Sequence, residues 1–223
     1  MLQCMISVVI PTQNSQATLT RCFDSLIGAT AHGVAREVIV ADGASTDDTL
    51  FIADAAGAHV VQAGKSRASQ LAAGAKAARG DWILFLHPET ALEPGWDVEA
   101  EAFIARVSLE RPRAAAFRFG LDDFDARSRR LEAMVALRCW LFKLPYGNQG
   151  LLIPRRLYNK LGDYRDTAAE DVDLVRRIGA RRLVLLRARA VNKAEATPCA
   201  LRRRALTILH ALRLPAGVLA RLG

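Results

Sequence analysis

The polar segment from His87 to Thr90 follows an apolar run and carries side chains of the types that hold metal ions. Glu89 offers carboxylate oxygens, which hard divalent cations prefer, and the imidazole of His87 tilts the preference from Mg²⁺ toward Mn²⁺. The alternative is an ordinary turn whose geometry Pro88 fixes, with no metal bound. The residue types alone leave both interpretations open.

A second candidate, Asp42, directly follows the apolar run EVIVA. Ligands of parallel sheets bind at the carboxyl ends of the strands, where a carboxylate can accept hydrogen bonds from a base or a ribose. Gly43 comes next and would let the backbone approach a ligand closely. The alternative is that Asp42 only caps its own turn.

Two further groups carry charge at the starts of predicted helices. Lys65 and Arg67 open an alanine-rich segment, and their cationic groups complement phosphate charge. Glu170 and Asp171 open another segment, where the helix macrodipole favours negative charge. Each group therefore has a plain structural interpretation, as a solvated or dipole-stabilised helix start, beside a functional one.

The elements that would position these residues alternate regularly in the first half of the chain. Strands are predicted over 5–10, 37–41, 59–62 and 82–86, and helices over 15–29, 45–58 and 66–80. Ser45 and Asp48 have capping-box spacing, and Gly80 marks the end of the third helix. This order predicts an α/β fold with a mostly parallel sheet and helices on both faces.

The second half is less regular. Helices are predicted over 96–107, 129–144 and 169–180, and strands over 114–119, 150–154 and 182–186. No linker rich in Gly, Ser or Pro divides the chain, so we expect one domain over 1–200 followed by an extension over 201–223. The pattern of the extension predicts a basic amphipathic helix pair, broken at Pro215.

Composition narrows the class of protein. The chain has 223 residues and is 51% hydrophobic, which is enough for one sizeable core. Its net charge is +8, but the segment 201–223 alone holds five arginines and no acid. A nucleic-acid-binding protein would more often interleave basic and aromatic residues or carry a known reading motif, and neither is present. We therefore expect no nucleic-acid partner.

The sequence also predicts a cytoplasmic location. No stretch approaches the ~20 apolar residues of a transmembrane helix, and the start lacks the basic region and cleavage site of a signal peptide. The four cysteines lie far apart without a Cys-x-x-Cys motif. Reduced, mostly buried thiols are expected rather than zinc ligands.

Several segments taken together resemble a known family. SVVIPTQNSQATLTRCFDSL, EVIVADGASTDDT and ARGDWILFLHPET are similar to the nucleotide-sugar-binding half of the family 2 glycosyltransferases, which have the GT-A fold. LPYGNQGLLIPRRLYNKLGDY and AEDVDLVRRIG resemble the acceptor half of a small bacterial branch of that family. The resemblance covers roughly 6–180 and implies a nucleotide-binding half over about 1–92 and an acceptor half over about 93–200.

The resemblance implies roles on the nucleotide side. Pro11 and Thr12 would lie against the nucleotide, and Asp42 would bind its base, usually uracil. Lys65 and Arg67 resemble a basic pair near the pyrophosphate. The expected donor is therefore a nucleotide-sugar, UDP-linked.

The metal motif of the family is also altered here. Relatives end the strand with Asp-x-Asp, whose second acid holds Mg²⁺ or Mn²⁺ against the diphosphate, and the small branch tends to have His first. His87 and Glu89 stand at the two positions. Glu adds a methylene and moves the carboxylate by ~1 Å or more, a displacement that can matter in a catalytic site.

On the acceptor side, the resemblance implies an inverting transfer to a hydroxyl. Asp171 would take the proton from that hydroxyl as it attacks the anomeric carbon, and Glu170 would orient the acceptor. Asn148 and Gln149 match a segment that commonly reads Gly-Asp-Gln and would contact the acceptor.

The sequence departs from the family at several positions. Ser15 stands where many members have an acid, and Asn148 and Glu89 each replace an Asp. Where the branch often has two arginines, this chain has a single basic residue, Lys193. An active transferase is therefore one interpretation. A catalytically degenerate domain that binds a nucleotide or a partner is the other.

The extension over 201–223 suggests a membrane contact. Its five arginines surround an apolar set, and such a segment can lie in the interface of an anionic membrane. Lipid-linked acceptors are common in the family, so a place on the inner face of the membrane is expected. The alternative is that the apolar side packs back on the domain.

Overall fold

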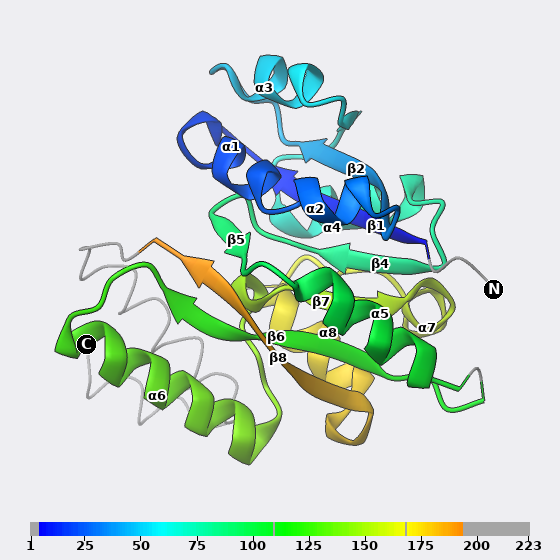
Figure 1. Cartoon of the computed structure of the whole chain (residues 1–223). Coiled ribbons are helices and arrows are strands. Elements are labelled where there is room, and N and C mark those ends of the chain that lie inside the picture. The colour runs from blue at the N-terminus through cyan, green and yellow to red at the C-terminus, as the bar shows by residue number, and fades with distance from the viewer. Residues whose placement is uncertain (1–4, 109, 168, 194–223) are drawn as a thin grey trace, which may run out of the picture.

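The strands of the computed structural model form one mixed sheet that includes both halves of the chain (Figure 1). The structure describes residues 5–108, 110–167 and 169–193. Within them the sheet has eight strands in the order β3-β2-β1-β4-β7-β6-β8-β5. The predicted α/β class is confirmed, and parallel pairing holds for part of the sheet.

The parallel part contains β1 (Ile6–Thr12), β2 (Ala35–Asp42), β3 (His59–Gln62) and β4 (Trp82–Phe85). β1 lies between β2 and β4, and all of its residues are buried. A strand that is covered on both faces requires a continuous apolar run of this kind. In the β1–β2 register Thr12 lies beside Asp42, so these two strands end together at one edge of the sheet.

Four strands complete the sheet: β5 (Thr90–Leu92), β6 (Ala114–Leu121), β7 (Leu151–Pro154) and β8 (Leu183–Asn192). β7 is antiparallel to β4 and β6, β8 is parallel to β6, and β5 is antiparallel to β8. The sequence does not predict β5, and it ends the last strand at residue 186. β5 is only three residues long, and 187–190 alternates arginine with alanine, so neither forms an apolar run.

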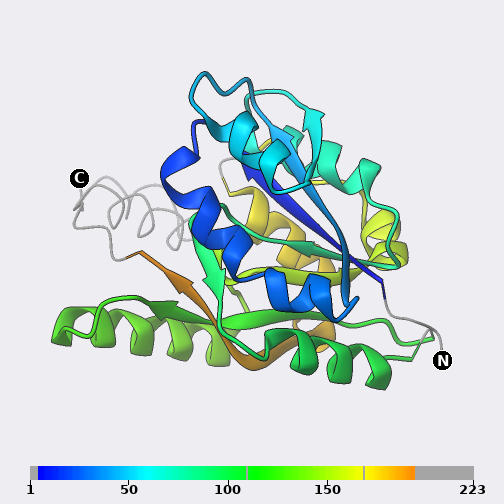
Figure 2. The same cartoon turned by 45° about the horizontal axis from the view of Figure 1, so that its top comes forward.

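Helices cover both faces of the sheet, as predicted (Figure 2). One apolar cluster takes residues from α1 (Gln16–Asp24), α2 (Ile27–Ala31), α3 (Thr49–Ala55) and α5 (Trp96–Arg106). The other takes residues from α4 (Arg67–Ala77), α7 (Arg155–Leu161) and α8 (Glu170–Ile178). The segments η1 (Gly147–Gln149) and η2 (Ala180–Arg182) are short 3-10 turns.

Local details differ from the predictions where side chains bond to nearby backbone. The helix predicted over 15–29 is two helices, because the Ser25 hydroxyl donates to Cys22 O at 2.7 Å where α1 ends. Ser45 does not cap α3, since its hydroxyl donates to Asp42. The sequence does not predict α7, which follows directly on β7.

Helix α6 (Ala126–Phe142) lies along the edge of the molecule beside β6 in both views (Figure 1, Figure 2). Its inner side places Val135 and Cys139 in a third apolar cluster. Its outer side exposes further large apolar residues: Met134, Leu137, Trp140 and Leu141. This helix is thus apolar on two sides.

Two of the four cysteines, Cys22 and Cys139, are free and buried, as expected, and burial raises the pKa of Cys22 to about 12. Within the described residues, no helix combines the length and apolar character needed to cross a bilayer. The extension over 201–223 lies outside the described residues, so its membrane contact stays a prediction.

Candidate active site

Strands β1 and β2 bring Thr12 and Asp42 together at the carboxyl edge of the sheet. The Thr12 hydroxyl donates to Asp42 Oδ1 at 2.9 Å. Ser45 donates to the same carboxylate from its hydroxyl at 2.5 Å and from its backbone N–H at 2.8 Å. Asp42 is fully buried, and its carboxylate organises the turn after β2. The contacts of Asp42 and the buried Pro11 with a nucleotide stay predictions.

Gly43 is favoured by packing. A Cβ at this position would overlap the side-chain amide of Gln70, which is buried in α4. Gln70 Nε2 donates in turn to Lys65 O at 3.3 Å. The loop that carries Lys65 is therefore fixed against the turn after β2.

Helix α4 begins beside the same edge. The hydroxyl of its N-cap Ser66 accepts the Ser69 N–H at 3.3 Å, and the flanking Lys65 and Arg67 are exposed. The Arg67 guanidinium is close enough to Asp171 to lower the pKa of that carboxyl. Arg67 from the first half of the chain and Asp171 from the second therefore belong to one electrostatic site.

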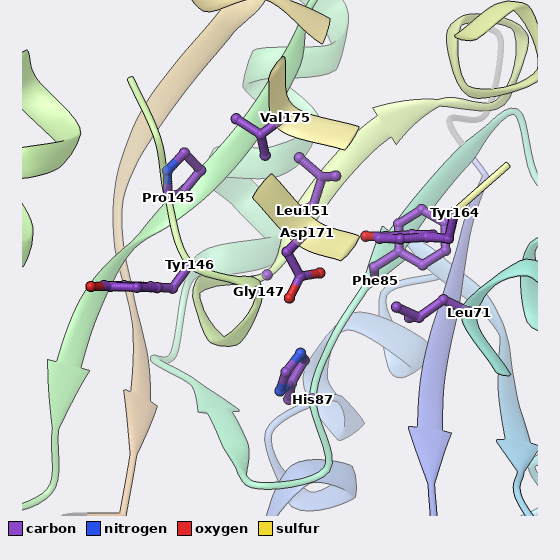
Figure 3. A pocket seen from close by; sticks show the side chains of 11 residues that line it. Leu71, Phe85, His87, Pro145, Tyr146, Gly147, Leu151, Tyr164, Asp171 and Val175 are labelled. Carbon is purple, nitrogen blue, oxygen red and sulfur yellow. The ribbon is translucent and has the colours of Figure 1, made fainter. Parts of the chain in front are cut away.

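A pocket lies between α4, the end of β4, the segment 145–150 and α8. Figure 3 shows the Asp171 carboxylate and the His87 imidazole facing each other within it. Leu71 and Phe85 form part of its apolar wall. The structure thus brings together two residues that the sequence singles out from distant segments.

The carboxyl group of Asp171 has a pKa near neutral pH. Burial, followed by the negative charge of Glu170, raises the pKa of Asp171 from 3.8 to about 7. Arg67 and a hydrogen bond from the Tyr164 side chain oppose this rise. Burial raises the pKa of Tyr164 well above its usual value, so that hydroxyl keeps its proton. A carboxyl group of this kind can accept a proton at neutral pH.

Two residues without a predicted role fix the position of Asp171. The Tyr164 N–H donates to the Tyr158 hydroxyl at 3.2 Å, and the Tyr164 ring packs edge-on against Phe85 at 5.1 Å. A Cβ on Gly147 would overlap the Asp171 carboxylate. Both residues lie in segments that resemble the family, but the sequence gives no sign that they touch Asp171.

Gln149 fastens the segment that carries Gly147. Its side chain is 1% exposed; Oε1 accepts the Tyr146 N–H at 2.8 Å, and Nε2 donates to Phe117 O at 2.9 Å. Both ends of the amide are thus used within the protein. The predicted contact of Gln149 with an acceptor stays a prediction, and the structure gives this side chain an internal role.

Asn148 lies next to a buried residue that the sequence analysis does not identify, Asn192. Asn192 Nδ2 donates to Asn148 O at 3.1 Å, and Asn192 Oδ1 accepts the Thr90 hydroxyl at 2.8 Å. Asn192 therefore connects the turn after β4 to the segment 146–150. Asn148 Oδ1 is buried and has no hydrogen-bond partner within the described residues. Its predicted role toward an acceptor is not tested.

The turn between β4 and β5 carries the two predicted metal ligands. Glu89 is exposed, and His87 is buried at the pocket. The described residues contain no group of three or more His, Cys, Asp or Glu side chains that could hold a metal. Mg²⁺ is usually bound by one or two carboxylates together with substrate phosphates and water. The metal-binding role of Glu89 and His87 stays a prediction.

The first half of the chain matches a known family. Residues 7–106 match the model of Glycosyl transferase family 2. The matched segment carries Thr12, Asp42, Arg67, His87 and Glu89. The first half of the chain is thus similar to the family 2 glycosyltransferases, and its predicted resemblance is confirmed.

Mycobacterial proteins are among the similar ones. PGL/p-HBAD biosynthesis glycosyltransferases of Mycobacterium bovis and Mycobacterium tuberculosis are 27% identical over 169 residues, which is 72% of this chain. The chain spans 63% of the length of these relatives.

Solved structures share the fold, which is GT-A-like. Glucosyl-3-phosphoglycerate synthase from Mycobacterium tuberculosis, crystallised with Mn²⁺, UDP and glucosyl-3-phosphoglycerate, superposes with a TM-score of 0.67 at 23% identity, covering 95% of this chain and 81% of that one. The same enzyme with Mn²⁺ and UDP-glucose gives a TM-score of 0.66 at 23% identity, covering 95% and 80%.

Proposed function

We propose that this chain is an inverting glycosyltransferase that moves a sugar from a UDP-linked donor to a hydroxyl acceptor. The observation that carries the proposal is the Asp171 carboxyl, whose pKa is raised to about 7 in a pocket beside His87. A base whose pKa lies near the working pH combines the required ionisation with a useful driving force for proton transfer. Asp171 takes the proton from the acceptor hydroxyl.

The donor lies at the carboxyl ends of β1, β2 and β4 in this proposal. Thr12, Pro11 and Asp42 hold the nucleoside, and Lys65 and Arg67 pair with the diphosphate. A solved structure with this fold, 23% identical to this chain, contains UDP. This supports UDP as the nucleotide of the donor. Exposed guanidinium and ammonium groups at the start of α4 are suited to phosphate oxygens.

Glu89, together with His87, holds a divalent cation, Mn²⁺ or Mg²⁺. A cation bound there would supply positive charge to the leaving diphosphate. Similar structures contain Mn²⁺ or Mg²⁺ together with UDP. The acceptor lies near Asn148, and Glu170 orients it.

The second candidate function is a domain that binds a nucleotide but does not catalyse transfer. The replacement of an expected Asp by Asn148 and by Glu89 favours it. Calorimetry with UDP, with and without Mn²⁺, combined with an assay of UDP release from a panel of UDP-sugars, separates the two functions. UDP binding with turnover supports the enzyme, binding without turnover supports the binding domain, and no UDP binding contradicts both.

A further inference from the structure

A second cavity, of about 560 Å³, lies between α6 and the strands β6 and β8. It shares no lining residue with the pocket of Asp171. Its volume falls within the range of about 300–1,000 Å³ that is usual for small-molecule sites. One lining residue, Gln149, is a predicted acceptor residue, but both ends of its amide are bonded within the protein.

The wall that β8 contributes is irregular. Leu185, Leu186 and Arg187 are consecutive and all line the cavity, whereas successive side chains of a regular strand point to opposite faces. The β6–β8 register shifts at this point. Glu99 accepts the N–H groups of Arg187 and Ala188 at 2.8 and 2.7 Å and so satisfies backbone donors in the irregular region. Such irregularities commonly redirect side chains toward a site.

The cavity is positively charged. Its charged lining residues are Arg118, Arg129, Arg187, Arg189 and Glu132. Glu132 pairs with Arg129 at 2.9 Å and with Arg189 at 2.5 Å. Within the described part of the chain, neither Arg118 nor Arg187 forms an ion pair. Arg118 also lies directly beside Arg189 in the sheet, and like charges in that position are destabilising.

The rest of the lining is largely apolar. Phe119, Val135 and Cys139 are buried side chains of the cluster beneath α6, and they face the same cavity. We propose that this cavity binds an amphiphilic anion, a phosphate or carboxylate group attached to an apolar portion. Guanidinium groups of Arg118 and Arg187 pair with the anionic group, and the apolar portion is removed from water against Phe119 and Val135.

The test uses decyl phosphate below its micelle concentration, with the full chain, in a calorimetric titration. Inorganic phosphate supplies the anion alone, and decanol supplies the apolar portion alone. We expect decyl phosphate to bind at least about 10-fold more tightly than either, because only it makes both charge-assisted and apolar contacts. Equal binding of phosphate, or of decanol, overturns the amphiphilic assignment, and no binding of decyl phosphate overturns the site.

Two matched pairs of variants locate the binding. Arg118→Gln combined with Arg187→Gln should weaken decyl phosphate binding about 10-fold or more, whereas Arg127→Gln combined with Arg130→Gln, on α6 but outside the cavity lining, should not. Ala136→Trp should obstruct the cavity, because Ala136 lines it. Leu137→Trp should not, because Leu137 is exposed and lies outside the lining. If only the two controls, Arg127→Gln with Arg130→Gln and Leu137→Trp, weakened binding, decyl phosphate would bind outside this cavity and the proposal would be contradicted.

UDP binding by each variant, measured in parallel, serves as the check on folding. It should match that of the unmodified chain, because the two cavities share no lining residue. If the unmodified chain binds decyl phosphate but not UDP, the glycosyltransferase proposal fails and this site stands.

Discussion

Asp171 lies in the first turn of α8, where the dipole of a helix favours a charged carboxylate. Burial and Glu170 nevertheless raise its pKa to about 7, while Arg67 and Tyr164 limit the rise. A Cβ at position 147 would overlap this carboxylate, so packing favours glycine there whatever the role of Asp171. A pKa near neutral pH suits a general base, and that role of Asp171 stays a proposal.

Asp171→Asn should retain the fold and UDP binding and lower sugar transfer by about 10²-fold or more, the usual effect of losing a general base. Single-turnover transfer measures the effect. Asp173→Asn is the matched control, because Asp173 lies in the same helical turn and pairs with Arg177 at 2.8 Å, away from the pocket. Transfer by Asp171→Asn at the rate of the control would remove Asp171 from the mechanism.

Glu89→Ala should abolish any dependence of UDP binding on Mn²⁺, and Glu89→Asp should keep or increase it. The reason is that a shorter carboxylate restores the residue usual in the family while alanine removes the oxygen ligand. Calorimetry in Mn²⁺ and in EDTA measures the dependence. If the unmodified chain binds UDP equally well in both solutions, the segment from His87 to Thr90 is a turn without metal.

At the residue scale, sequence reasoning finds side chains whose place follows from the end of a strand or the start of a helix. His87 and Asp171 are of this kind, and both line one pocket. Tyr164, Gly147 and Asn192 could not be found in the same way. Their contacts depend on packing between segments far apart in the chain, for which a single sequence carries no local signal.

The elements are connected at the site by Asn192, the last residue of β8. It joins Thr90 at the start of β5 to Asn148 in η1 through hydrogen bonds of 2.8 and 3.1 Å. The side chain is 4% exposed, so removing it leaves buried polar groups without partners.

Asn192→Ala should destabilise the protein by about 1–3 kcal/mol, the cost of leaving a buried polar group unsatisfied. Urea unfolding measures the free energy. Asn159→Ala, at an exposed position of α7, is the control and should change stability little. Equal effects of the two substitutions would show that the Asn192 hydrogen bonds contribute nothing specific.

Among the elements, apolar runs predict β1, β2 and β4 because these strands lie inside a covered sheet, whereas β3 is a partly exposed edge strand with a short apolar run. β5 is held by β8, a strand about a hundred residues later, as the pairing of Thr90 with Asn192 shows. Short elements that are stabilised by distant partners have no periodic pattern of their own. Their absence from the prediction has that physical cause.

For the whole molecule, the raised pKa of Asp171 links stability to pH. The folded group titrates near 7 and the unfolded group near 3.8, so the folded state holds more protons between these values. Stability therefore falls as pH rises from about 4 to about 7. Asp171→Asn removes this contribution.

Asp171→Asn should accordingly raise the melting temperature at pH 8 relative to the unmodified chain by a few °C, about 2–4 °C per kcal/mol in a protein of this size. At pH 4 the gain should shrink, because the folded group is then protonated and the pH lies close to the unfolded pKa of 3.8, where most of the difference in bound protons has not yet accumulated. Scanning calorimetry at the two pH values measures it. A gain that is the same at both pH values would mean that charge on Asp171 is not the cause.

The pairing of β5 with β8 also bears on the order in which the protein is made. A nascent chain folds from its N-terminus as it leaves the ribosome. The turn that carries His87 and Glu89 is tied at one end by β4, which can pair with β1 early, and at the other by β5, which pairs with β8. The ribosome must therefore finish β8 before this turn can be held at both ends. Even though its residues are encoded in the first half, this turn is completed only when Asn192 emerges.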